Sequence, residues 1–400
     1  MTRPLRVAVV RDYPEEGWAS MDLTGEMMLT HLSRECAGDV EAVDVCPPFR
    51  HRLTRWPVVR GLRASRNVDR LLNRFGDYPR ALHAAVRAGG FDLYHLVDHS
   101  YSQLVHELPP GRAVVTCHDL DTFRCLLEPE REPRPRWFRA MAGRTLAGLK
   151  KAAAVVCNSE TTRRAILAHD LVPESRLHLA WVGVAPEFSA APDPSADAEA
   201  ARWLGPVVPG APPDLLHVGS TIPRKRIDLL LEIFAALRRA YPGARLIKAG
   251  AGLNAEQERL AETLGVADAI VRLPFFAPGE RGVLAAVYRR ASLVVQPSDA
   301  EGFGLPVAEA LACGATVLAS DLPALREVGG DAAVYRPVGD IAGWVEAAAV
   351  LLDERVQQSP AWHARHEAGL ARASLFQWPR HARQLADIYR AVLAGVSARV

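Results

Sequence analysis

Two glutamates that flank a glycine-containing loop are the residues of this chain whose type and spacing best suit chemistry. Glu301 and Glu309 are separated by Gly-Phe-Gly-Leu-Pro-Val-Ala, and an apolar run at 291–297 precedes them. That run predicts a buried strand, while Pro306 and Gly314 predict the start and the end of a short helix. Glycine lets a ligand approach the backbone, free amide groups at a helix start favour anions, and carboxylates accept hydrogen bonds from hydroxyls. The pattern therefore predicts a site for a ligand with both phosphate and sugar, and a nucleotide sugar fits best.

Two basic residues form a second candidate site further upstream. The segment 215–234 predicts a strand, a loop and a helix, and Arg224 and Lys225 lie in the loop, close to the helix start. An arginine side chain offers a rigid fork to phosphate oxygens, and a lysine offers a movable point charge. Basic residues at a helix start are often only solvated, but the glutamate motif that follows favours a diphosphate site at this loop.

The elements that must position these residues alternate along the chain. Helical patterns separate apolar runs, and this alternation predicts doubly wound parallel sheets. The runs that predict buried strands lie at 5–10, 93–97, 113–117 and 154–157, and again at 215–218, 244–249, 269–273, 293–296 and 316–319.

Composition limits the remaining classes of protein. The 400 residues suffice for two domains, and 24% charged with 49% hydrophobic residues is a normal globular balance. A formal net charge of +2 does not predict nucleic-acid binding. We expect a cytoplasmic protein, because no apolar run reaches the roughly 18 residues of a membrane span and no secretory signal pattern opens the chain. The six cysteines contain no Cys-x-x-Cys pair and are expected to be reduced.

The glutamate motif resembles the donor-site signature of family 4 glycosyltransferases, which are retaining enzymes with the GT-B fold. In that fold, two doubly wound, Rossmann-like domains face a central cleft. The resemblance implies that Glu301 contacts the hydroxyls of the donor sugar and that Glu309 holds the ribose hydroxyls. It also implies that one backbone stretch lines the sugar and the diphosphate, namely Gly302, Phe303, Gly304 and Leu305.

The upstream loop resembles the Pro-Arg-Lys loop of the same family. The resemblance implies that Arg224 and Lys225 stabilise the departing nucleoside diphosphate. Gly219 and Ser220 open the loop and belong to the expected donor site, and many members of the family carry an arginine at the position of Ser220. We therefore expect diphosphate binding to depend more strongly on Arg224 and Lys225.

A polar pair in the first half of the chain, His118 and Asp119, directly follows the strand predicted at 113–117. Doubly wound sheets bind ligands at such strand ends, and the resemblance implies that His118 contacts the donor sugar near the reacting centre, with Asp119 on the acceptor side. Alternatively, Asp119 caps the next helix and His118 is an incidental loop residue. Asp119-Leu-Asp121 also matches the metal-binding Asp-x-Asp of GT-A glycosyltransferases. We reject that interpretation because it leaves both C-terminal sites unexplained, and we predict no metal and no other cofactor.

The loop after the first predicted strand, at 12–20, has one glycine where the family has two or three. We place Gly17 and Trp18 on the acceptor side, because Gly17 allows close approach and the Trp18 ring could stack on a sugar. The alternative for Trp18 is that it merely covers the loop.

Two basic runs that carry aromatic residues lie at 50–74 and 131–151. Such a surface can dock on anionic lipid, at about 1 kcal/mol per cation near the membrane. A solvated helix face explains it equally well. A peripheral contact with the inner face of a membrane, and a lipid-linked or polyanionic acceptor, are therefore hypotheses.

We predict an acceptor-binding domain at 1–190, a linker at 191–213 rich in Pro, Ala, Asp and Gly, and a donor-binding domain at 214–377. The resemblance implies that the helix predicted at 378–400 crosses back to the first domain. We expect a hexose to be transferred from a UDP- or GDP-linked donor to a hydroxyl acceptor, in glycan, glycolipid or polysaccharide biosynthesis. The alternative is a non-catalytic glycosyltransferase-like docking protein, and a GT-B phosphorylase or a nucleotide-sugar epimerase comes last.

Overall fold

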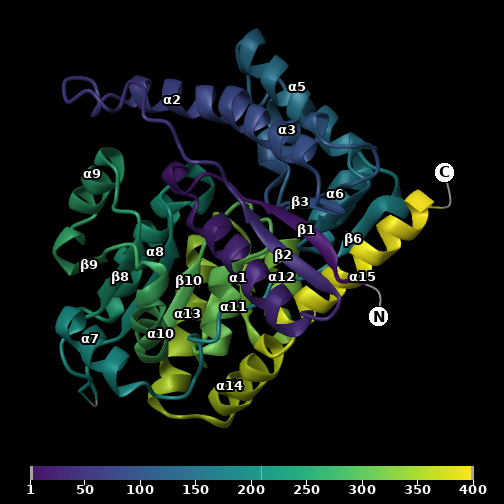
Figure 1. Cartoon of the computed structure of the whole chain (residues 1–400). Helices are drawn as coiled ribbons and strands as arrows, with labels where there is room; N and C mark the ends of the chain where they lie inside the picture. The colour runs from purple at the N-terminus through teal and green to yellow at the C-terminus, as the bar shows by residue number, and fades with distance from the viewer. Residues whose placement is uncertain (1–2, 209, 398–400) are drawn as a thin grey trace. The chain divides into compact units, whose positions relative to one another are not determined.

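The chain forms two compact units, each an α/β layer structure (Figure 1). The computed structural model describes residues 3–208 and 210–397. The first unit contains the chain up to Gly183 and the chain from Trp378 onward, and the second unit is Val184–Gln377. The first unit is therefore discontinuous in sequence.

The first unit is built on a six-stranded sheet in which every strand pair is parallel. Val7, Ala8, Val9 and Val10 are fully buried, as expected for a parallel strand covered by helices on both faces. The strand order is β2 (Val40–Val45), β1 (Leu5–Val10), β3 (Leu93–Leu96), β4 (Ala113–Cys117), β5 (Ala154–Cys157) and β6 (Leu177–Leu179). Its helices are α1 (Ala19–Glu35), α2 (Arg63–Leu72), the π-helical turn η2 (Asn73–Asp77), α3 (Tyr78–Ala88), α4 (Arg124–Leu127), α5 (Arg136–Lys151), α6 (Glu160–Ala168) and α15 (Trp378–Ser397), with 3₁₀ turns η1 (Pro14–Glu16), η3 (His99–Glu107), η4 (Asp121–Phe123) and η5 (Glu174–Arg176).

The second unit repeats this plan with a second six-stranded parallel sheet. The strand order is β12 (Val334–Arg336), β11 (Val317–Ser320), β10 (Leu293–Gln296), β7 (Asp214–Gly219), β8 (Arg245–Gly250) and β9 (Ile270–Leu273). Its helices are α7 (Pro194–Leu204), α8 (Ile227–Ala240), α9 (Ala255–Thr263), α10 (Arg281–Arg290), α11 (Leu305–Ala312), α12 (Pro323–Gly329), α13 (Ile341–Val356) and α14 (Pro360–Ala373), with 3₁₀ turns η6 (Pro223–Lys225), η7 (Ala267–Ala269), η8 (Pro278–Glu280) and η9 (Gly330–Ala332).

The strand order of each sheet reverses at one point, and this fixes where a ligand can bind. The reversal lies between β1 and β3 in the first sheet and between β7 and β10 in the second. Open α/β sheets bind ligands beyond the carboxyl ends of the strands at such a switch point. A crevice forms there because the connections that follow the two neighbouring strands run in opposite directions. The loops that follow these four strands are therefore the first place to look for a site.

Three short or polar strands escaped the sequence prediction. β2 contains two polar residues, Glu41 and Asp44, among its apolar ones, and β6 and β12 have three residues each. All three lie at a sheet edge, where one side of the strand needs no apolar covering. The nine apolar runs predicted as strands are all strands of the two sheets.

The segment expected as a linker, 191–213, contains a helix instead. Asp193 caps α7 by accepting hydrogen bonds from the amides of Ser195 and Ala196, both at 3.1 Å. Ala200 and Leu204 are buried on its inner face, and α7 packs on α10 within the second unit. A composition rich in alanine is typical of linkers, which is why the sequence predicted one here. Small side chains also allow two helices to pack closely, as α7 and α10 do.

Helix α15 completes the first unit by packing on α1. Leu385, Ile388 and Tyr389 are buried, and the Tyr389 hydroxyl lies 2.6 Å from His95 Nδ1 on β3. Burial lowers the pKa of His95 to about 3, so the ring is neutral and forms an ordinary hydrogen bond with the tyrosine. No helix in the described part of the chain is long and apolar enough to cross a membrane.

Candidate active site

The two predicted donor loops meet at the switch point of the second sheet. β7 and β10 are parallel neighbours, so the loop at 220–226 and the loop at 297–304 leave the same edge side by side. The Asp299 amide donates to the Arg224 carbonyl at 2.9 Å, and Arg224 Nη1 donates to the Ala300 carbonyl at 3.1 Å. The strand order thus joins two motifs that are far apart in sequence.

Glu301 lies at the centre of this junction. Lys225 Nζ donates to Glu301 Oε1 at 2.6 Å, and Arg224 Nη1 lies 3.5 Å from Oε2. Ser298 Oγ also donates to Oε1, at 2.7 Å. The side chain of Glu301 is 6% exposed and that of Lys225 is 10% exposed, so the pair is largely withdrawn from water. The structure therefore brings together Arg224, Lys225 and Glu301, as the sequence motifs require.

The charges of this cluster do not cancel. Burial opposes ionisation of Glu301, but Lys225 and Arg224 outweigh it, and the pKa of Glu301 is lowered from its usual value. One carboxylate thus faces two cations. The remaining positive charge suits an anion such as a diphosphate.

Glu309 occupies a different environment from Glu301. It points from the middle of α11 into the interior, where it is 7% exposed and accepts a hydrogen bond from the Tyr288 hydroxyl at 3.0 Å. Burial raises its pKa to about 8, although Tyr288 and the Arg281 charge act in the opposite direction. Without a ligand, Glu309 is therefore mostly protonated at neutral pH.

The loop between the two glutamates presents its backbone and not its aromatic ring. Phe303 is buried and packs edge-on against Phe376, with ring centroids 5.5 Å apart. Gly304 precedes α11 with φ at 103°, in the left-handed region, and Leu305 begins the helix. At Phe303, the backbone and not the side chain is therefore available to line a ligand.

In the first unit, both ring nitrogens of His118 are occupied. Nε2 donates to the Val97 carbonyl at 2.8 Å, and Nδ1 accepts from the Asn158 side-chain amide at 3.2 Å. Burial is the main cause that lowers its pKa, so the ring is neutral. Asp119 Oδ1 accepts from the Asp121 amide at 3.0 Å, just before the short turn η4, whose N-cap residue is Leu120. The roles expected for His118 and Asp119 toward a substrate remain predictions.

Comparison with known proteins covers both units. A family model described as Glycosyltransferase Family 4 matches residues 25–188, and one described as Glycosyl transferases group 1 matches residues 212–354. The chain belongs to glycosyltransferase family 4. This is a family of transferase enzymes.

Individual relatives of this family 4 glycosyltransferase agree with the assignment. A D-inositol 3-phosphate glycosyltransferase of Segniliparus rotundus is 38% identical over 187 residues, which are 44% of this chain and 40% of that relative. The O-antigen chain mannosyltransferase B of Escherichia coli is 29% identical over 285 residues, 70% of each protein. The chain thus spans less than half of the first relative's length. Among solved structures, the sucrose-phosphate synthase of Thermosynechococcus elongatus matches with a TM-score of 0.72 at 21% identity, over 98% of this chain and all of that one, and it shares the GT-B fold.

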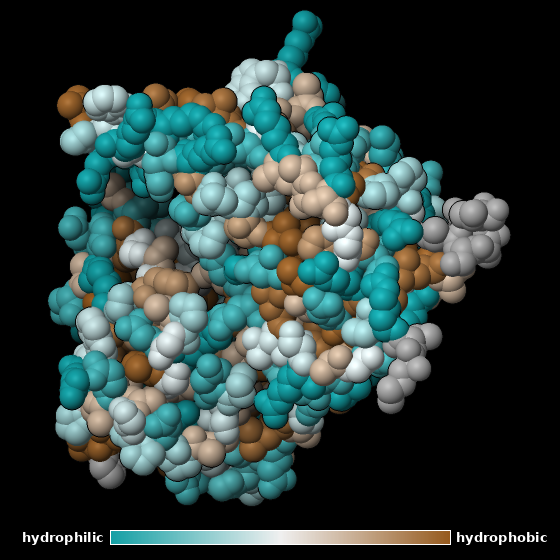
Figure 2. Space-filling view, in the orientation of Figure 1, coloured by the Kyte–Doolittle hydropathy of each residue, from teal (hydrophilic) through white to brown (hydrophobic). Residues whose placement is uncertain are grey.

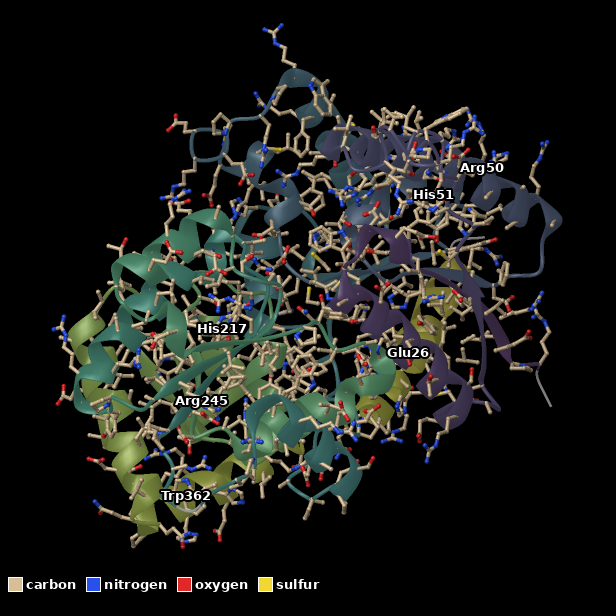
Figure 3. All side chains as sticks on the ribbon, turned by 90° about the vertical axis from the view of Figure 1, so that its left-hand side faces the viewer. Glu26, Arg50, His51, His217, Arg245 and Trp362 are labelled. Carbon is tan, nitrogen blue, oxygen red and sulfur yellow. The ribbon has the colours of Figure 1, made fainter. Side chains whose placement is uncertain are left out.

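A buried lysine beneath the loop at 220–226 was not predicted. Lys248, on β8, is 1% exposed, and its Nζ donates to the carbonyls of Gly219 at 2.6 Å and Ala251 at 3.1 Å. Burial, with a smaller contribution from Lys225, lowers its pKa to about 8. His217 lies on β7, two residues before Gly219, and its side chain is fully buried in the same unit (Figure 3). Lys248 therefore holds the carbonyl of Gly219 inward and adds positive potential beneath Ser220.

The first unit of the glycosyltransferase also contains a buried polar cluster that was missed. His99 Nδ1 lies 3.0 Å from Asp98 Oδ1, and its Nε2 lies 3.6 Å from Asp119 Oδ1. Burial opposes the imidazolium, but Asp98 and Asp119 outweigh it and the pKa of His99 is raised. Asp12 lies nearby at the end of β1, and burial followed by the Asp98 charge raises its pKa. Asp98 and His99 follow a predicted strand just as His118 and Asp119 do, and that rule would have found them.

Gly17 and Trp18 lie in the loop beyond β1. Gly17 ends the turn η1 with φ at 73°, and Trp18 is 46% exposed with the Arg70 guanidinium 5.7 Å from its ring centroid. Arg70 also pairs with Glu16 at 2.9 Å. The loop is therefore tied to the arginines of α2.

Replacing Gly304 with alanine is expected to destabilise the protein by about 1–3 kcal/mol, the usual cost of a strained backbone. The added Cβ would require φ near 103° and would lie 2.6 Å from Leu325 Cδ2. Chemical denaturation measures this loss. Gly252→Ala is the matched control, because Gly252 has no positive φ and open space around its Cβ position. Equal stability of the two variants would contradict the strain argument.

Proposed function

We propose that this protein is a retaining glycosyltransferase that moves a hexose from a UDP- or GDP-linked sugar to a hydroxyl acceptor, in glycan, glycolipid or polysaccharide biosynthesis. The observation that carries the proposal is the cluster of Arg224, Lys225 and Glu301 at the switch point of the second sheet. Two cations and one buried carboxylate suit a diphosphate bonded to a sugar. Glu309 supplies a second carboxyl group on the same loop and helix.

Each residue then has a role in one displacement. The acceptor oxygen forms a bond to the anomeric carbon on the face from which the diphosphate leaves, as the bond from that carbon to the phosphate oxygen breaks. A phosphate oxygen takes the acceptor proton, so no protein nucleophile is required. Arg224 and Lys225 stabilise the charge that develops on the diphosphate, and Glu301 orients the sugar through its hydroxyls.

The remaining roles follow from the same proposal. Glu309 accepts hydrogen bonds from the ribose hydroxyls, and His118 contacts the donor sugar close to the reacting carbon. The backbone of Gly219, Ser220 and Gly302 to Leu305 lines the diphosphate and sugar. Names of relatives that include an inositol phosphate glycosyltransferase and a mannosyltransferase support a hexose and a hydroxyl acceptor. We propose that the reaction needs no metal.

The rival function is that of a non-catalytic docking protein with the same fold. Ser220 favours it, because a cation often present in the family is missing there. The intact, buried pairing of Lys225 with Glu301 favours the enzyme. A protein with no diphosphate to bind has no use for a buried ion pair, which often stabilises no better than an apolar pair.

A thermal-shift series distinguishes the two functions. Ligands that bind only the folded state raise its apparent stability by mass action. We expect one of UDP, GDP and their hexose conjugates to raise Tm, equally with and without EDTA. A rise abolished by EDTA would disprove the metal-free site. No rise at millimolar concentration with any nucleotide would favour the docking protein.

A further inference from the structure

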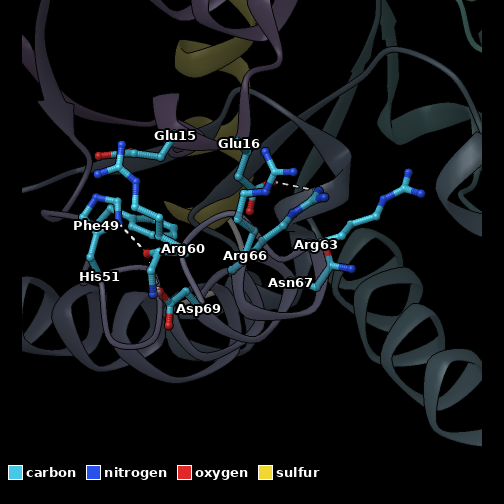
Figure 4. Close-up of a pocket in the computed structure, with 11 residues that line it drawn as sticks. Glu15, Glu16, Phe49, His51, Arg60, Arg63, Arg66, Asn67 and Asp69 are labelled. Atoms are coloured by element: carbon cyan, nitrogen blue, oxygen red, sulfur yellow. Dashed lines mark hydrogen bonds and ion pairs between the residues drawn. The ribbon is translucent and has the colours of Figure 1, made fainter. Parts of the chain in front are cut away.

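A cavity of about 420 Å³ lies within the first unit, beside the loop that follows β1 (Figure 4). One wall comes from that loop and the other from the segment that leads from β2 into α2. Figure 4 shows the glutamates of the first wall opposite the arginines of the second. The residues that matter for its chemistry are Glu15 and Glu16 on one wall and Arg60, Arg63, Arg66 and Asn67 on the other.

The cavity carries cations that the protein does not neutralise. Arg60, Arg63 and Arg66 are exposed, and no carboxylate of residues 3–208 or 210–397 lies within ion-pair distance of them. Glu16 cannot serve them, because its side chain is 1% exposed and already pairs with Arg70 at 2.9 Å. Arg74 lies at 3.4 Å from the same carboxylate. The unpaired positive charge therefore faces the cavity.

Asp69 also borders the cavity, but its carboxylate already accepts several hydrogen bonds from the protein. Its buried carboxylate accepts hydrogen bonds from the amides of Leu53 and Thr54, both at 2.9 Å, and from the Thr54 hydroxyl at 2.6 Å. Burial opposes its charge, but these bonds outweigh burial and lower its pKa. Asn73 adds bonds to the amide and carbonyl of Arg50 at 2.8 and 3.0 Å. The arginine-bearing wall is thus held in place before any ligand binds.

The start of α2 adds to the attraction for an anion. Its N-cap is Leu62, no side chain caps it, and its first turn contains no acidic residue. Arg63 is the first residue of the helix and Arg66 lies one turn on. Uncapped amide groups and the helix dipole favour a negative charge at this end.

Hydroxyl-binding groups accompany the cations. Glu15 is exposed on the facing wall, and Asn67 lies beside Arg66 on α2. A carboxylate accepts hydrogen bonds from hydroxyls, and an amide both accepts and donates them. Trp18, under the Arg70 guanidinium, lies on the same loop as Glu15. The site suits a polyol or sugar that carries a phosphate.

We propose that this cavity binds the phosphate group of the acceptor, so that the enzyme transfers its hexose to a phosphate-bearing sugar or polyol. The inference rests on the proposed function, because only a transferase has an acceptor. Arg60, Arg63 and Arg66 hold the phosphate, and Glu15 and Asn67 hold hydroxyls of the same molecule. The phosphate could belong to a soluble ester or to a lipid headgroup.

The lipid source is worth testing because the same segment exposes apolar side chains. Trp56 is 56% exposed and Val58 is 91% exposed, and Leu53 and Leu62 are also exposed. In Figure 2, hydrophobic side chains lie among hydrophilic ones along the edge that corresponds to this segment in Figure 1. Arginines next to exposed aromatic and aliphatic side chains suit the surface of an anionic bilayer.

The test compares phosphate binding in the full-length protein and three variants. Titration calorimetry with glucose 6-phosphate and with glucose measures the soluble source. Flotation with vesicles of phosphatidylinositol and of phosphatidylcholine alone measures the lipid source. The variants are Arg63→Gln with Arg66→Gln together, Arg224→Gln for the diphosphate loop, and Arg87→Gln as an exposed control on α3.

We expect the double variant to lose roughly tenfold or more in affinity for the phosphate-bearing probe, as expected for removing charged hydrogen-bond donors. Arg87→Gln and Arg224→Gln should leave this binding unchanged, and glucose should not bind. Arginine-dependent binding of glucose 6-phosphate supports a soluble acceptor, and arginine-dependent binding only to phosphatidylinositol vesicles supports a lipid-linked one. Equal binding by wild type and double variant, or loss only in Arg224→Gln, overturns the proposal.

Nucleotide binding separates this proposal from the function on which it rests. The double variant should keep the thermal shift given by UDP or GDP, which also shows that it is folded. If no nucleotide stabilises the wild type while phosphate binding still needs the arginines, the proposed transferase function is contradicted and the anion site is supported. If nucleotides bind but phosphate binding does not depend on the arginines, the transferase function is supported and the proposed acceptor site is contradicted.

Discussion

Replacing Lys225 with alanine is expected to lower kcat by roughly 100- to 1000-fold, the loss typical of removing one group that stabilises transition-state charge. Lys225 is the closest cation to Glu301 and lies in the loop proposed to hold the departing diphosphate. Arg224→Ala should lose a similar factor. Initial rates of hexose transfer, or of donor hydrolysis without acceptor, measure the effect at saturating donor. Near wild-type turnover in both variants would remove the proposed diphosphate site.

The same substitution is expected to destabilise the protein. Without Lys225, Glu301 stays buried, and its remaining ion pair is the longer contact with Arg224, at 3.5 Å. Breaking a buried ion pair on one side typically costs about 3–5 kcal/mol. If the unpaired carboxylate causes the loss, Lys225→Ala combined with Glu301→Gln should recover most of the stability, although not the rate. A double variant no more stable than Lys225→Ala would place the cause elsewhere.

A matched control lies next to Lys225. Arg226 is the third basic residue of the loop, but its guanidinium pairs with Asp228 at 2.7 Å and not with Glu301. Its φ is 48°, a left-handed conformation that asparagine tolerates better than most residues. Arg226→Asn should therefore keep kcat within a few-fold of wild type. A loss as large as that of Lys225→Ala would mean that charge at the loop matters more than position.

Much of the fold could be predicted from sequence because buried parallel strands are nearly continuous apolar runs. That rule identified β1, β4 and β10, and it failed at β2, an edge strand in which Glu41 and Asp44 interrupt the apolar run. It also failed in the segment of α7, because composition alone cannot distinguish an alanine-rich helix from an alanine-rich linker. Periodicity would have helped there, since Ala196, Ala200 and Leu204 repeat every four residues.

The donor-side motifs pointed to Glu301 and Glu309 but could not give their electrostatic states. Glu301 and Glu309 look alike in sequence, yet one lies against two cations and the other lies against a tyrosine hydroxyl. Lys248 belongs to no motif, because its role depends on the backbone carbonyls to which it donates, and these are known only from the structure. These differences arise from strand order and packing, which bring together residues far apart in the chain.

The acceptor side shows the limit of motif reasoning. His118 and Asp119 were chosen by their position after a predicted strand and by resemblance, and both form hydrogen bonds within the first unit. The arginines at 60, 63 and 66 read equally well as a solvated helix face or as a binding surface. Only the structure shows that neighbouring carboxylates are already paired, as Glu16 is with Arg70, while these arginines are not.

Glu309→Gln is expected to stabilise the folded protein increasingly as the pH rises. The carboxyl group has a pKa near 4.5 when unfolded and about 8 when folded. Between these values the folded protein holds a proton that the unfolded chain has released, so raising the pH favours unfolding of the wild type. Glutamine lacks this proton and resembles the neutral acid. The stability difference between variant and wild type should therefore grow by about 1.4 kcal/mol per pH unit from about 4.5 to about 8.

If Glu309 has the proposed ribose role, the same variant should also bind the nucleotide donor more weakly. Two ribose hydroxyls need an ionised carboxylate, so the wild-type affinity should fall roughly tenfold per pH unit below about 8, as the ionised fraction falls. The affinity of the variant should not follow pH in this way. Denaturation and nucleotide titrations from pH 5 to pH 9 measure both effects, with Glu346→Gln, an exposed carboxylate on α13, as the control. Parallel stability curves for Glu309→Gln and wild type would show that Glu309 is already ionised, and an unchanged donor affinity would exclude its ribose role.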